Sequence, residues 1–253
     1  MRGVLEGLAL VDWVLLAVAA ACVGFAKTAI GGVGIVAVAL FAIVLPARES
    51  TGALLPLLIA GDVVAVSAYA RHGSRRTVLA LLPGVVPGLL LGALFLAVVG
   101  DTVLTLFLGT VLLVLCGWQL ALRLRSREPV PTRPATRTAT VAAGATGGFA
   151  TMTANAAGPV MTLYLVMAGL PKLQMIGTGA WFYLVVNLMK LPISAGLHLI
   201  DPESLLLDLV LVPVMLLGAL TGWHVVRRMH QQQFELAALA LAALSSAVLL
   251  ATV

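Results

Sequence analysis

Residues 24–34 read Gly-Phe-Ala-Lys-Thr-Ala-Ile-Gly-Gly-Val-Gly and separate two apolar segments, residues 11–26 and 33–45. Each segment is shorter than the roughly 20 residues that a helix needs to cross a bilayer. The three glycines within residues 31–34 disfavour a continuous helix, because each costs about 1 kcal/mol relative to alanine. Non-helical backbone at membrane depth is tolerated only where it is buried in protein or lines a wet cavity. We therefore predict a broken helix here, with Lys27 inside the break as a candidate functional cation.

The composition indicates that this broken helix lies in a membrane. Of the 253 residues, 61% are hydrophobic and 10% are charged, and the mean hydropathy is +1.12. These values exclude an ordinary soluble domain, and the chain lacks the period-two alternation of a membrane barrel. The net charge of +5 comes mostly from arginines in short loops, which reports topology rather than nucleic-acid binding. We predict an all-α, polytopic, multi-pass protein of the cell (inner) membrane, with the lipid bilayer as partner and no nucleic acid.

About ten apolar segments follow one another along the chain, and we expect about 8–10 of them to be transmembrane segments. They cover residues 8–26, 32–46, 50–70, 77–99, 102–124, 138–154, 157–170, 173–198, 203–226 and 231–252. Basic residues gather in three breaks, at 71–76, 123–137 and 227–230, which the positive-inside rule assigns to the cytoplasm. Counting segments back from these breaks places the N-terminus outside.

The basic, proline-rich cytoplasmic loop 126–137 divides the chain into two membrane repeats, residues 1–125 and 138–253. Landmarks recur between the halves at an offset of 124 to 126: Gly24-Phe25-Ala26 as Gly148-Phe149-Ala150, Gly34 as Gly158, Pro46 as Pro171, Asp62 as Asn187, and Pro87 with Gly92 as Pro213 with Gly218. Each half has five segments, an odd number, so the second repeat must be inverted. Inverted repeats with broken helices that meet near the midplane are typical of secondary transporters. The alternative is a duplication in a membrane protein that transports nothing.

The first break, closing at Pro46, and its repetition from Gly147 to Pro171 resemble the sulfite exporter TauE/SafE family, also called TSUP. The resemblance covers nearly the whole chain, including its size, its two halves and the central loop. It implies transport of sulfite, sulfoacetate, other organosulfur compounds or small carboxylates such as lactate. The second break departs from a glycine-rich pattern, since residues 151–155 read Thr-Met-Thr-Ala-Asn. Hydroxyl and amide donors are therefore expected on that side.

We predict that the two breaks meet around one small anionic substrate. Lys27 would supply positive charge, and helix N-termini near Gly32 and Ala157 would direct backbone N–H groups at the anion. The other predicted substrate-binding residues are Thr28, Gly31, Gly32, Thr151, Thr153, Asn155 and Asn187. The alternative is that the glycines only permit close helix packing and that Lys27 extends to an interface.

Two further charges, Asp62 and Lys190, lie deep in the repeat-related segments 50–70 and 173–198. An ion pair between them would lower the cost of burying either charge, which gives a structural interpretation. In the alternative interpretation, Asp62 is a proton-coupling acid. The aromatic cluster 181–183 is interpreted as an interface belt, with a substrate gate as the alternative.

Enzyme motifs are absent from the sequence. It contains no phosphate-binding Gly-x4-Gly-Lys-Ser/Thr run, no His-Glu-x-x-His and no Gly-x-Ser-x-Gly. We therefore predict no enzyme, no catalytic residue, no metal site and no cofactor.

The predicted function is secondary transport of small anions of the sulfite/sulfonate organosulfur type by alternating access. A channel-like facilitator of small anions or of carboxylates such as lactate is the first alternative. A non-transport membrane enzyme or assembly factor is the second. The sequence leaves open whether a proton or a sodium ion is the coupling ion. It also leaves open whether the protein forms a homo-oligomer.

Overall fold

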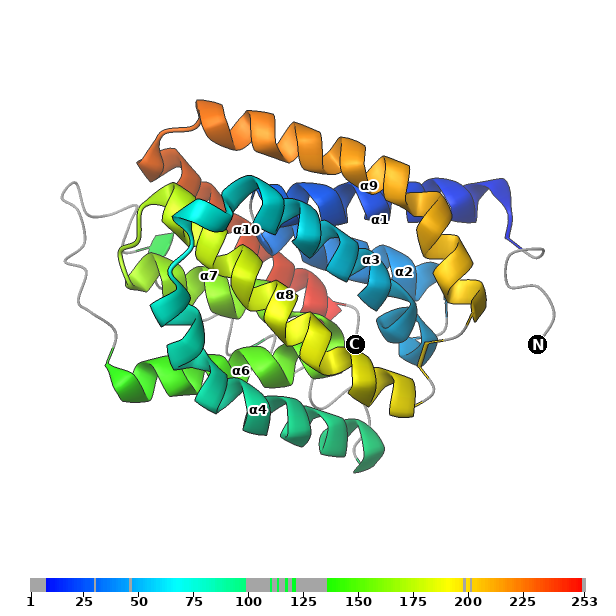
Figure 1. Ribbon diagram of the computed structural model, residues 1–253. Helices are drawn as coiled ribbons and strands as arrows, with labels where there is room; N and C mark the ends of the chain where they lie inside the picture. The colour runs from blue at the N-terminus through cyan, green and yellow to red at the C-terminus, as the bar shows by residue number, and fades with distance from the viewer. Residues whose placement is uncertain are drawn as a thin grey trace.

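The computed structural model describes residues 8–29, 31–45, 47–98, 110, 113, 117, 120–121, 136–197, 199–200 and 202–251. Every regular element among them is helical (Figure 1). The first half contains α1 (Leu10–Thr28), η1 (Gly31–Val33), α2 (Gly34–Val44), α3 (Ala47–Tyr69), η2 (Ala70–His72) and α4 (Arg75–Val98). The second half contains α6 (Arg137–Ala154), α7 (Ala157–Met167), α8 (Lys172–Gly196), α9 (Pro202–Arg228) and α10 (Gln231–Ala251).

Most of the predicted segment 102–124 and of the loop 126–137 lies outside the described residues, so the division of the chain at this loop stays a prediction. Five helical stretches are long and apolar enough to cross a membrane: Leu10–Thr28, Ser50–His72, Arg75–Phe95, Lys172–Gly196 and Pro202–Arg228. Large apolar side chains cover their outer faces; Leu10 is 80% exposed and Leu209 is 68% exposed. A surface of this kind suits lipid, and the predicted all-α, polytopic membrane fold is confirmed.

Both predicted helix breaks are present, and each turns the chain back on itself. The first is narrower than predicted, because Lys27 lies in the last turn of α1 rather than inside the break and the glycine-rich residues 31–33 form the 3₁₀ helix η1. Helix α1 begins at the right-hand end of the molecule in Figure 1 and α2 returns toward that end, whereas α6 begins at the left-hand end and α7 returns there. Helices α2 and α7 have 11 residues each, or about 16 Å, too short to span a bilayer. Each pair is therefore a hairpin that ends inside the protein, and two of the ten predicted segments are not full spans.

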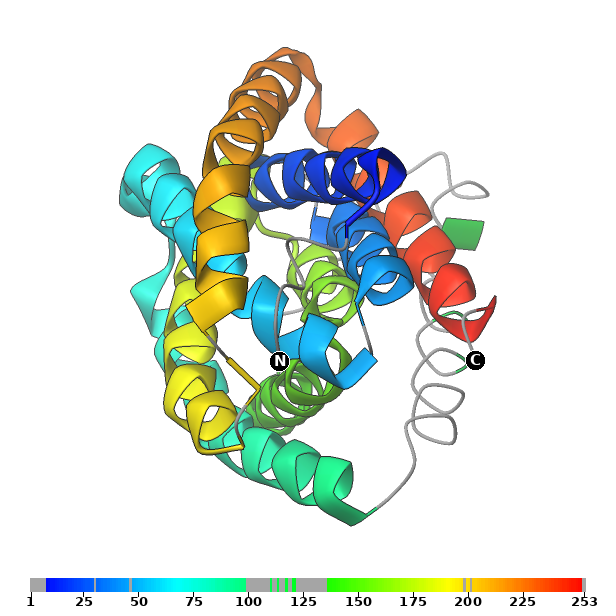
Figure 2. The same cartoon turned by 90° about the vertical axis from the view of Figure 1, so that its right-hand side faces the viewer.

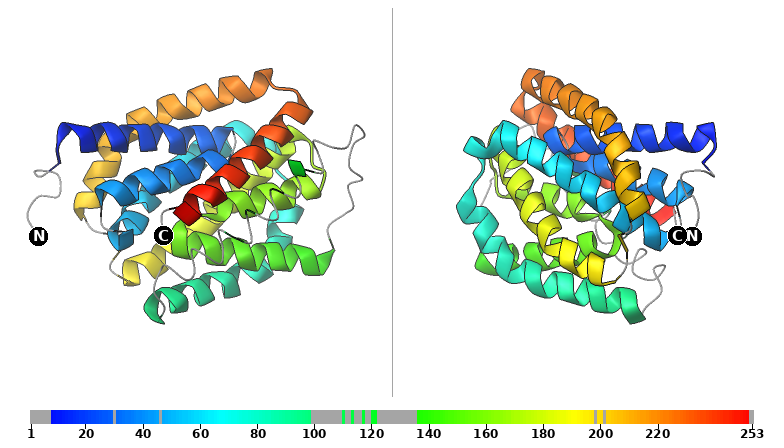
Figure 3. Two further views of the ribbon diagram at one scale, coloured as in Figure 1. Left: turned by 180° about the vertical axis from the view of Figure 1, so that it is seen from behind. Right: turned by 45° about the vertical axis from the view of Figure 1, so that its right-hand side comes forward.

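The two hairpins enter from opposite ends because the halves are inverted relative to each other. The repeat-related helices α3 and α8 run in opposite directions, as do α4 and α9 (Figures 1 and 3). The two halves also contact each other through equivalent pairs of helices. Helix α6 of the second half lies along α4 of the first, and α1 of the first half lies along α9 of the second. Figure 2, a view from the right-hand end, shows α2 and α7 inside the outer helices, and Figure 3 shows α10 lying across them from behind. The predicted inverted repeat is confirmed.

Glycines allow the closest of these helix contacts. A Cβ atom added to Gly24 would lie 1.9 Å from the Met215 carbonyl oxygen and 2.6 Å from the Ala219 nitrogen. The repeat-equivalent Gly148 has the same two kinds of neighbour: its Cβ would lie 2.6 Å from the carbonyl oxygen of residue 85 and 3.2 Å from the nitrogen of residue 89. Backbones therefore touch at both places, as small residues permit in membrane helices.

This packing shifts one predicted repeat match. Residues 215 and 85 occupy equivalent places, as do residues 219 and 89, which gives an offset of 130 (215 − 85 and 219 − 89). The sequence had paired Pro87 with Pro213, at an offset of 126, so the structural counterpart of Pro213 is Pro83 instead. The difference of four residues is about one helical turn. The sequence alone allowed either register because proline and glycine recur at four-residue spacing in α4.

Replacing Gly24 with alanine is expected to destabilise the protein by about 1–3 kcal/mol, because the new methyl group overlaps the α9 backbone. Thermal unfolding in detergent, followed by size-exclusion chromatography, measures this effect. Gly196→Ala is the matched control, since nothing lies within 4 Å of a Cβ added there. Equal melting temperatures for the two variants would contradict the backbone contact between α1 and α9.

Except for Arg48 at the start of α3, the basic residues that the structure describes outside the membrane segments gather at one end of the molecule. The connection η2 lies there with the start of α8 and the end of α9 (Figure 1). Lys172 Nζ donates to the Val226 carbonyl oxygen at 2.9 Å, and also to the carbonyl oxygen of Met229. Trp181 Nε1 donates to the carbonyl oxygen of Ala70 at 3.4 Å. We call this the basic end, and the positive-inside rule assigns it to the cytoplasm.

Candidate functional site

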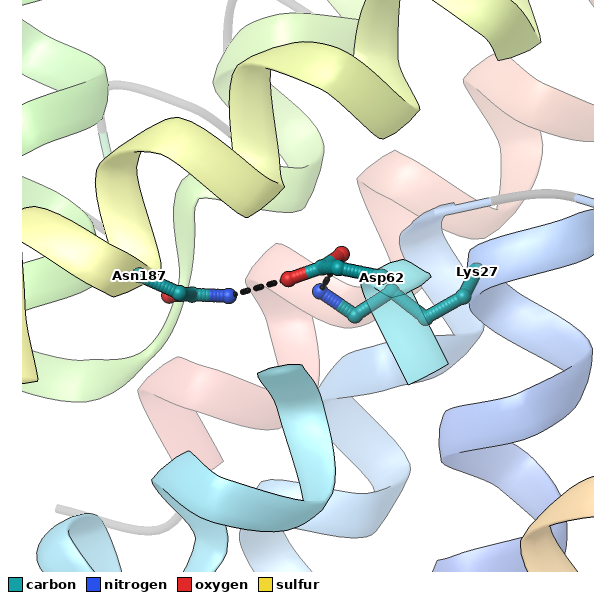
Figure 4. A network of polar contacts seen from close by, with 3 residues as sticks. All are labelled: Lys27, Asp62 and Asn187. Carbon is teal, nitrogen blue, oxygen red and sulfur yellow. Dashed lines mark hydrogen bonds and ion pairs between the residues drawn. The ribbon is translucent and has the colours of Figure 1, made fainter. Parts of the chain in front are cut away.

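A buried ion pair lies where the first hairpin meets the crossing of α3 and α8. Lys27 Nζ is 2.6 Å from Asp62 Oδ1, and Asn187 Nδ2 donates to Asp62 Oδ2 at 2.6 Å (Figure 4). Asp62 is fully buried, and the Lys27 side chain is 10% exposed. Asp62 and Asn187 are equivalent positions of the two repeats. The two halves are therefore joined by a hydrogen bond between equivalent residues.

The predicted ion pair between Asp62 and Lys190 is therefore corrected, because Asp62 pairs with Lys27. Lys190 lies on α8 three residues beyond Asn187, and its side chain is directed at the second break. Its Nζ donates to the Thr151 carbonyl oxygen at 2.7 Å and to Asn155 Oδ1 at 2.5 Å. The physical reason is that a closer cation from α1 already occupies the face of Asp62 that Lys190 would need.

A cavity of about 50 Å³ lies between the two hairpin tips. We call it the central cavity; the residues that line it are Val23, Ala26, Lys27, Gly31, Gly34, Val38, Leu58, Thr151, Asn155, Ala157, Gly158, Tyr183 and Asn187. A single water needs about 10–15 Å³, so the space suits a small ion. The tips themselves touch, since a Cβ added to Gly31 would lie 3.9 Å from Gly158 Cα.

The two short helices begin at this cavity from opposite sides. Helix α2 starts at Gly34 and α7 starts at Ala157, close to the predicted starts at Gly32 and Ala157. The N–H groups of a first helical turn have no partner within the helix, and the dipole places partial positive charge there. The second break ends at Asn155, which adopts a left-handed conformation with φ of 50°. Two positive helix ends and Lys27 thus face one small space.

A second cavity of about 50 Å³ lies on the basic-end side of Lys27. We call it the inner cavity; its walls come from early turns of α8 and α10 and a late turn of α7: Ala26, Lys27, Ala29, Gly31, Thr162, Leu165, Met175, Ile176, Gly179, Ala180, Tyr183 and Phe234. Lys27 and Tyr183 line both cavities, so they lie between the two. Lys27 Nζ is 4.8 Å from the centre of the Tyr183 ring, a cation–π distance.

Tyr183 is the site residue that the sequence interpretation missed. Phe182 is fully buried, so it and Tyr183 belong to the interior rather than to an interface belt. Tyr183 precedes Asn187 by four residues, which puts both on one face of α8. That spacing is the sequence signal that could have found it.

Two predicted binding residues, Thr28 and Thr153, do not line the central cavity. The Thr28 hydroxyl donates to the carbonyl oxygens of Ala219, at 2.7 Å, and Gly24, at 3.1 Å, while the Tyr69 hydroxyl donates to the Thr28 carbonyl oxygen at 3.0 Å. The Thr153 hydroxyl donates to the carbonyl oxygen four residues earlier at 2.9 Å, as threonine commonly does in helices. Gly32 lies in η1, and whether it lines the cavity is outside what the structure describes, so its predicted role stays a prediction. The two threonines hold the hairpins in place, and this corrects their predicted role.

Comparison with known proteins gives one match: the family model described as Sulfite exporter TauE/SafE matches residues 16–249. The chain belongs to the sulfite exporter TauE/SafE family. No curated protein and no solved structure matched. TauE/SafE membership confirms the predicted resemblance, indicates membrane transport of sulfur-containing anions, and agrees with the apolar helices in placing the chain in a membrane as a multi-pass protein.

Gly31→Ala tests the central cavity of this TauE/SafE protein with little strain. The added Cβ would lie 3.5 Å from the Tyr183 hydroxyl, an ordinary contact, yet it would occupy space in both cavities. We expect the melting temperature to stay within a few degrees and the substrate KM to rise about tenfold, equivalent to 1.4 kcal/mol. Gly196→Ala serves again as the control. An unchanged KM would show that the substrate does not use this space.

Proposed function

We propose that this protein is a secondary transporter that moves a small anion of the sulfite or sulfonate type through the central cavity by alternating access. The observation that carries the proposal is the meeting of Lys27 with the starts of α2 and α7 at one small cavity between the two hairpins. Family membership supports the anion class.

The polar groups around the cavity are hydrogen-bond donors whose positive charge is partly balanced, which suits an anion that binds reversibly. Lys27 has three N–H donors, and Asp62 uses one of them. The ion pair holds the Lys27 ammonium in position and leaves its other two N–H groups for an anion. Asn187 is fixed by the same carboxylate and has a second N–H, while Thr151 and Asn155 lie on the opposite wall. Free N–H groups at the starts of α2 and α7 complete a set of donors that resembles helix-end anion sites. We assign Lys27, Gly31, Thr151, Asn155 and Asn187 to substrate contact.

The hairpin arrangement supports alternating access. The α1–α2 hairpin opens toward one end of the molecule and α6–α7 toward the other, and both tips contact the same cavity. Movement of one half against the other would uncover the cavity from one side at a time, which is how inverted-repeat transporters work. The inner cavity, separated from the central cavity by Lys27 and Tyr183, lies along the route to the basic end.

Purified full-length protein in sealed proteoliposomes tests the function. Uptake and counterflow of labelled sulfite, methanesulfonate and lactate are measured with and without a pH gradient. We expect saturable counterflow of sulfite or methanesulfonate. Flux without counterflow would indicate a channel-like facilitator, counterflow of lactate alone would indicate a carboxylate carrier, and no flux of any anion would favour a membrane enzyme or assembly factor.

A further inference from the structure

We propose that Lys190 is the proton-binding group that couples anion movement to proton movement: it takes up a proton when an anion enters the central cavity and gives it up when the anion leaves. The inference rests on the proposed transport function. Lys190 is 1% exposed, and its two hydrogen-bond partners, the Thr151 carbonyl oxygen and Asn155 Oδ1, are both uncharged. Within the described part of the chain, no carboxylate lies within ion-pair distance of it.

The number of acceptors fits a lysine that changes its charge. A neutral amine has two N–H hydrogens, and Lys190 has two acceptors, at 2.7 Å and 2.5 Å. An ammonium has three, so its third hydrogen would need a further acceptor. Both present acceptors belong to residues that line the central cavity. Lys190 itself does not line the cavity, so an anion there would lie beyond these two groups and would supply the missing negative charge across them.

The charges nearby make anion and proton binding cooperative. Lys27 and Asp62 neutralise each other, so a protonated Lys190 is left as a single buried positive charge. Burying an unpaired ion is costly, and one negative charge in the cavity offsets that cost. Coupling of this kind is reciprocal, so protonation strengthens anion binding to the same degree.

Among the ionisable groups around α8 whose side chains the structure describes, no carboxylate forms an ion pair with Lys190. From α8 itself, Tyr183 faces Lys27. The elements packed on α8 contribute Asp12, Cys22 and Lys27 from α1; Arg48, Glu49, Asp62 and Tyr69 from α3; Arg71 and His72 from η2; Arg75 and Arg76 from α4; Tyr164 from α7; and Glu235 from α10. Those of η2 and α4 are exposed at the basic end. The side chains of Arg48, Glu49 and Glu235 lie outside the described set.

The transport cycle then moves one proton with each monovalent anion. On one side, the Lys190 amine accepts a proton from water while the anion binds. After reorientation both are released on the other side, and the empty protein returns with a neutral amine. The net movement carries no charge, so a membrane potential alone should drive little uptake.

Proteoliposomes containing a trapped pH-sensitive dye test the coupling with labelled methanesulfonate and with lactate, anions that carry no proton of their own near neutral pH. We expect acidification of the interior with about one proton per anion taken up. Net uptake of either anion without acidification of the interior, by wild-type protein that also shows counterflow, would overturn this inference and leave the proposed function intact. Absence of counterflow would overturn both.

Lys190→Arg separates coupling from structure, because the guanidinium keeps its charge permanently. A permanently charged site can exchange anions but cannot return empty, so we expect pH-driven net uptake to fall at least about tenfold more than counterflow. Asp208→Asn is the control: Asp208 is also buried in a membrane helix, but it lines neither cavity and, unlike Lys190, makes no hydrogen bond to the central-cavity residues Thr151 and Asn155. Loss of pH-driven uptake in Asp208→Asn, with Lys190→Arg still coupled, would assign the proton to Asp208 and overturn the inference. Should Lys190→Arg fail to fold, the proton count of the wild-type protein decides.

Discussion

Replacing Lys27 with methionine is expected to lower the efficiency of saturable anion transport by about 10- to 150-fold. The range follows from the roughly 1.5–3 kcal/mol that a hydrogen bond to a charged group contributes. Methionine keeps the length and apolar stem of lysine but removes the charge and its donors. Because Lys27 lines both cavities, the loss should affect binding from either side of the membrane. Initial rates of sulfite and methanesulfonate counterflow in proteoliposomes measure it.

The single variant also leaves Asp62 buried without its cation, so folding and transport must be separated. The double variant Lys27→Met/Asp62→Asn removes both charges and keeps the shapes close to the originals. Since replacing a buried ion pair by neutral groups of similar volume is often harmless to stability, we expect the double variant to fold and still to show this loss of transport. Wild-type counterflow in a folded double variant would remove Lys27 from the substrate site.

Much of this arrangement was predictable because it depends on backbone constraints. Glycines at residues 31–34 cannot sustain a helix cheaply, and an apolar run of 11 residues cannot cross a bilayer, so the hairpin around Lys27 follows from local sequence. The odd number of segments per half forces inversion. The equivalence of Asp62 and Asn187 then places them at the same depth, and they do form a hydrogen bond.

The side-chain pairings were less predictable, because each had more than one physically acceptable partner. Lys27 and Lys190 are both long enough to reach the middle of α3, and only the direction in which α8 faces decides between them. Thr28 and Thr153 could have faced the cavity or bonded to their own helices. Their rotamers depend on neighbouring helices that are remote in sequence: α9 approaches Thr28 through Ala219. Tyr183 was missed because an aromatic cluster near a helix start usually marks an interface.

Asp62→Asn is expected to have the largest effect on stability, a loss of about 3–5 kcal/mol, since it leaves Lys27 buried without a counter-charge. Asparagine keeps the shape of aspartate and can still accept the hydrogen bond from Asn187, so the cost comes mainly from the missing charge. The yield of monodisperse protein and its melting temperature in detergent measure the loss. Asp208→Asn is the matched control, because that buried carboxyl has no cationic partner within the described residues, and its replacement should cost far less.

Comparing Asp62→Asn with the double variant Lys27→Met/Asp62→Asn distinguishes two roles for Asp62: a structural partner of Lys27, or the acid that carries the coupled proton. If Asp62 acts by neutralising Lys27, adding Lys27→Met to Asp62→Asn should restore most of the lost stability, and the double-mutant cycle should give a coupling free energy of several kcal/mol. If Asp62 instead carried the transported proton, Asp62→Asn alone would fold as well as the wild-type protein and lose only its response to a pH gradient. The ion pair of 2.6 Å and the hydrogen bond from Asn187 favour the first result, because each carboxylate oxygen already has a partner, one in each half of the protein.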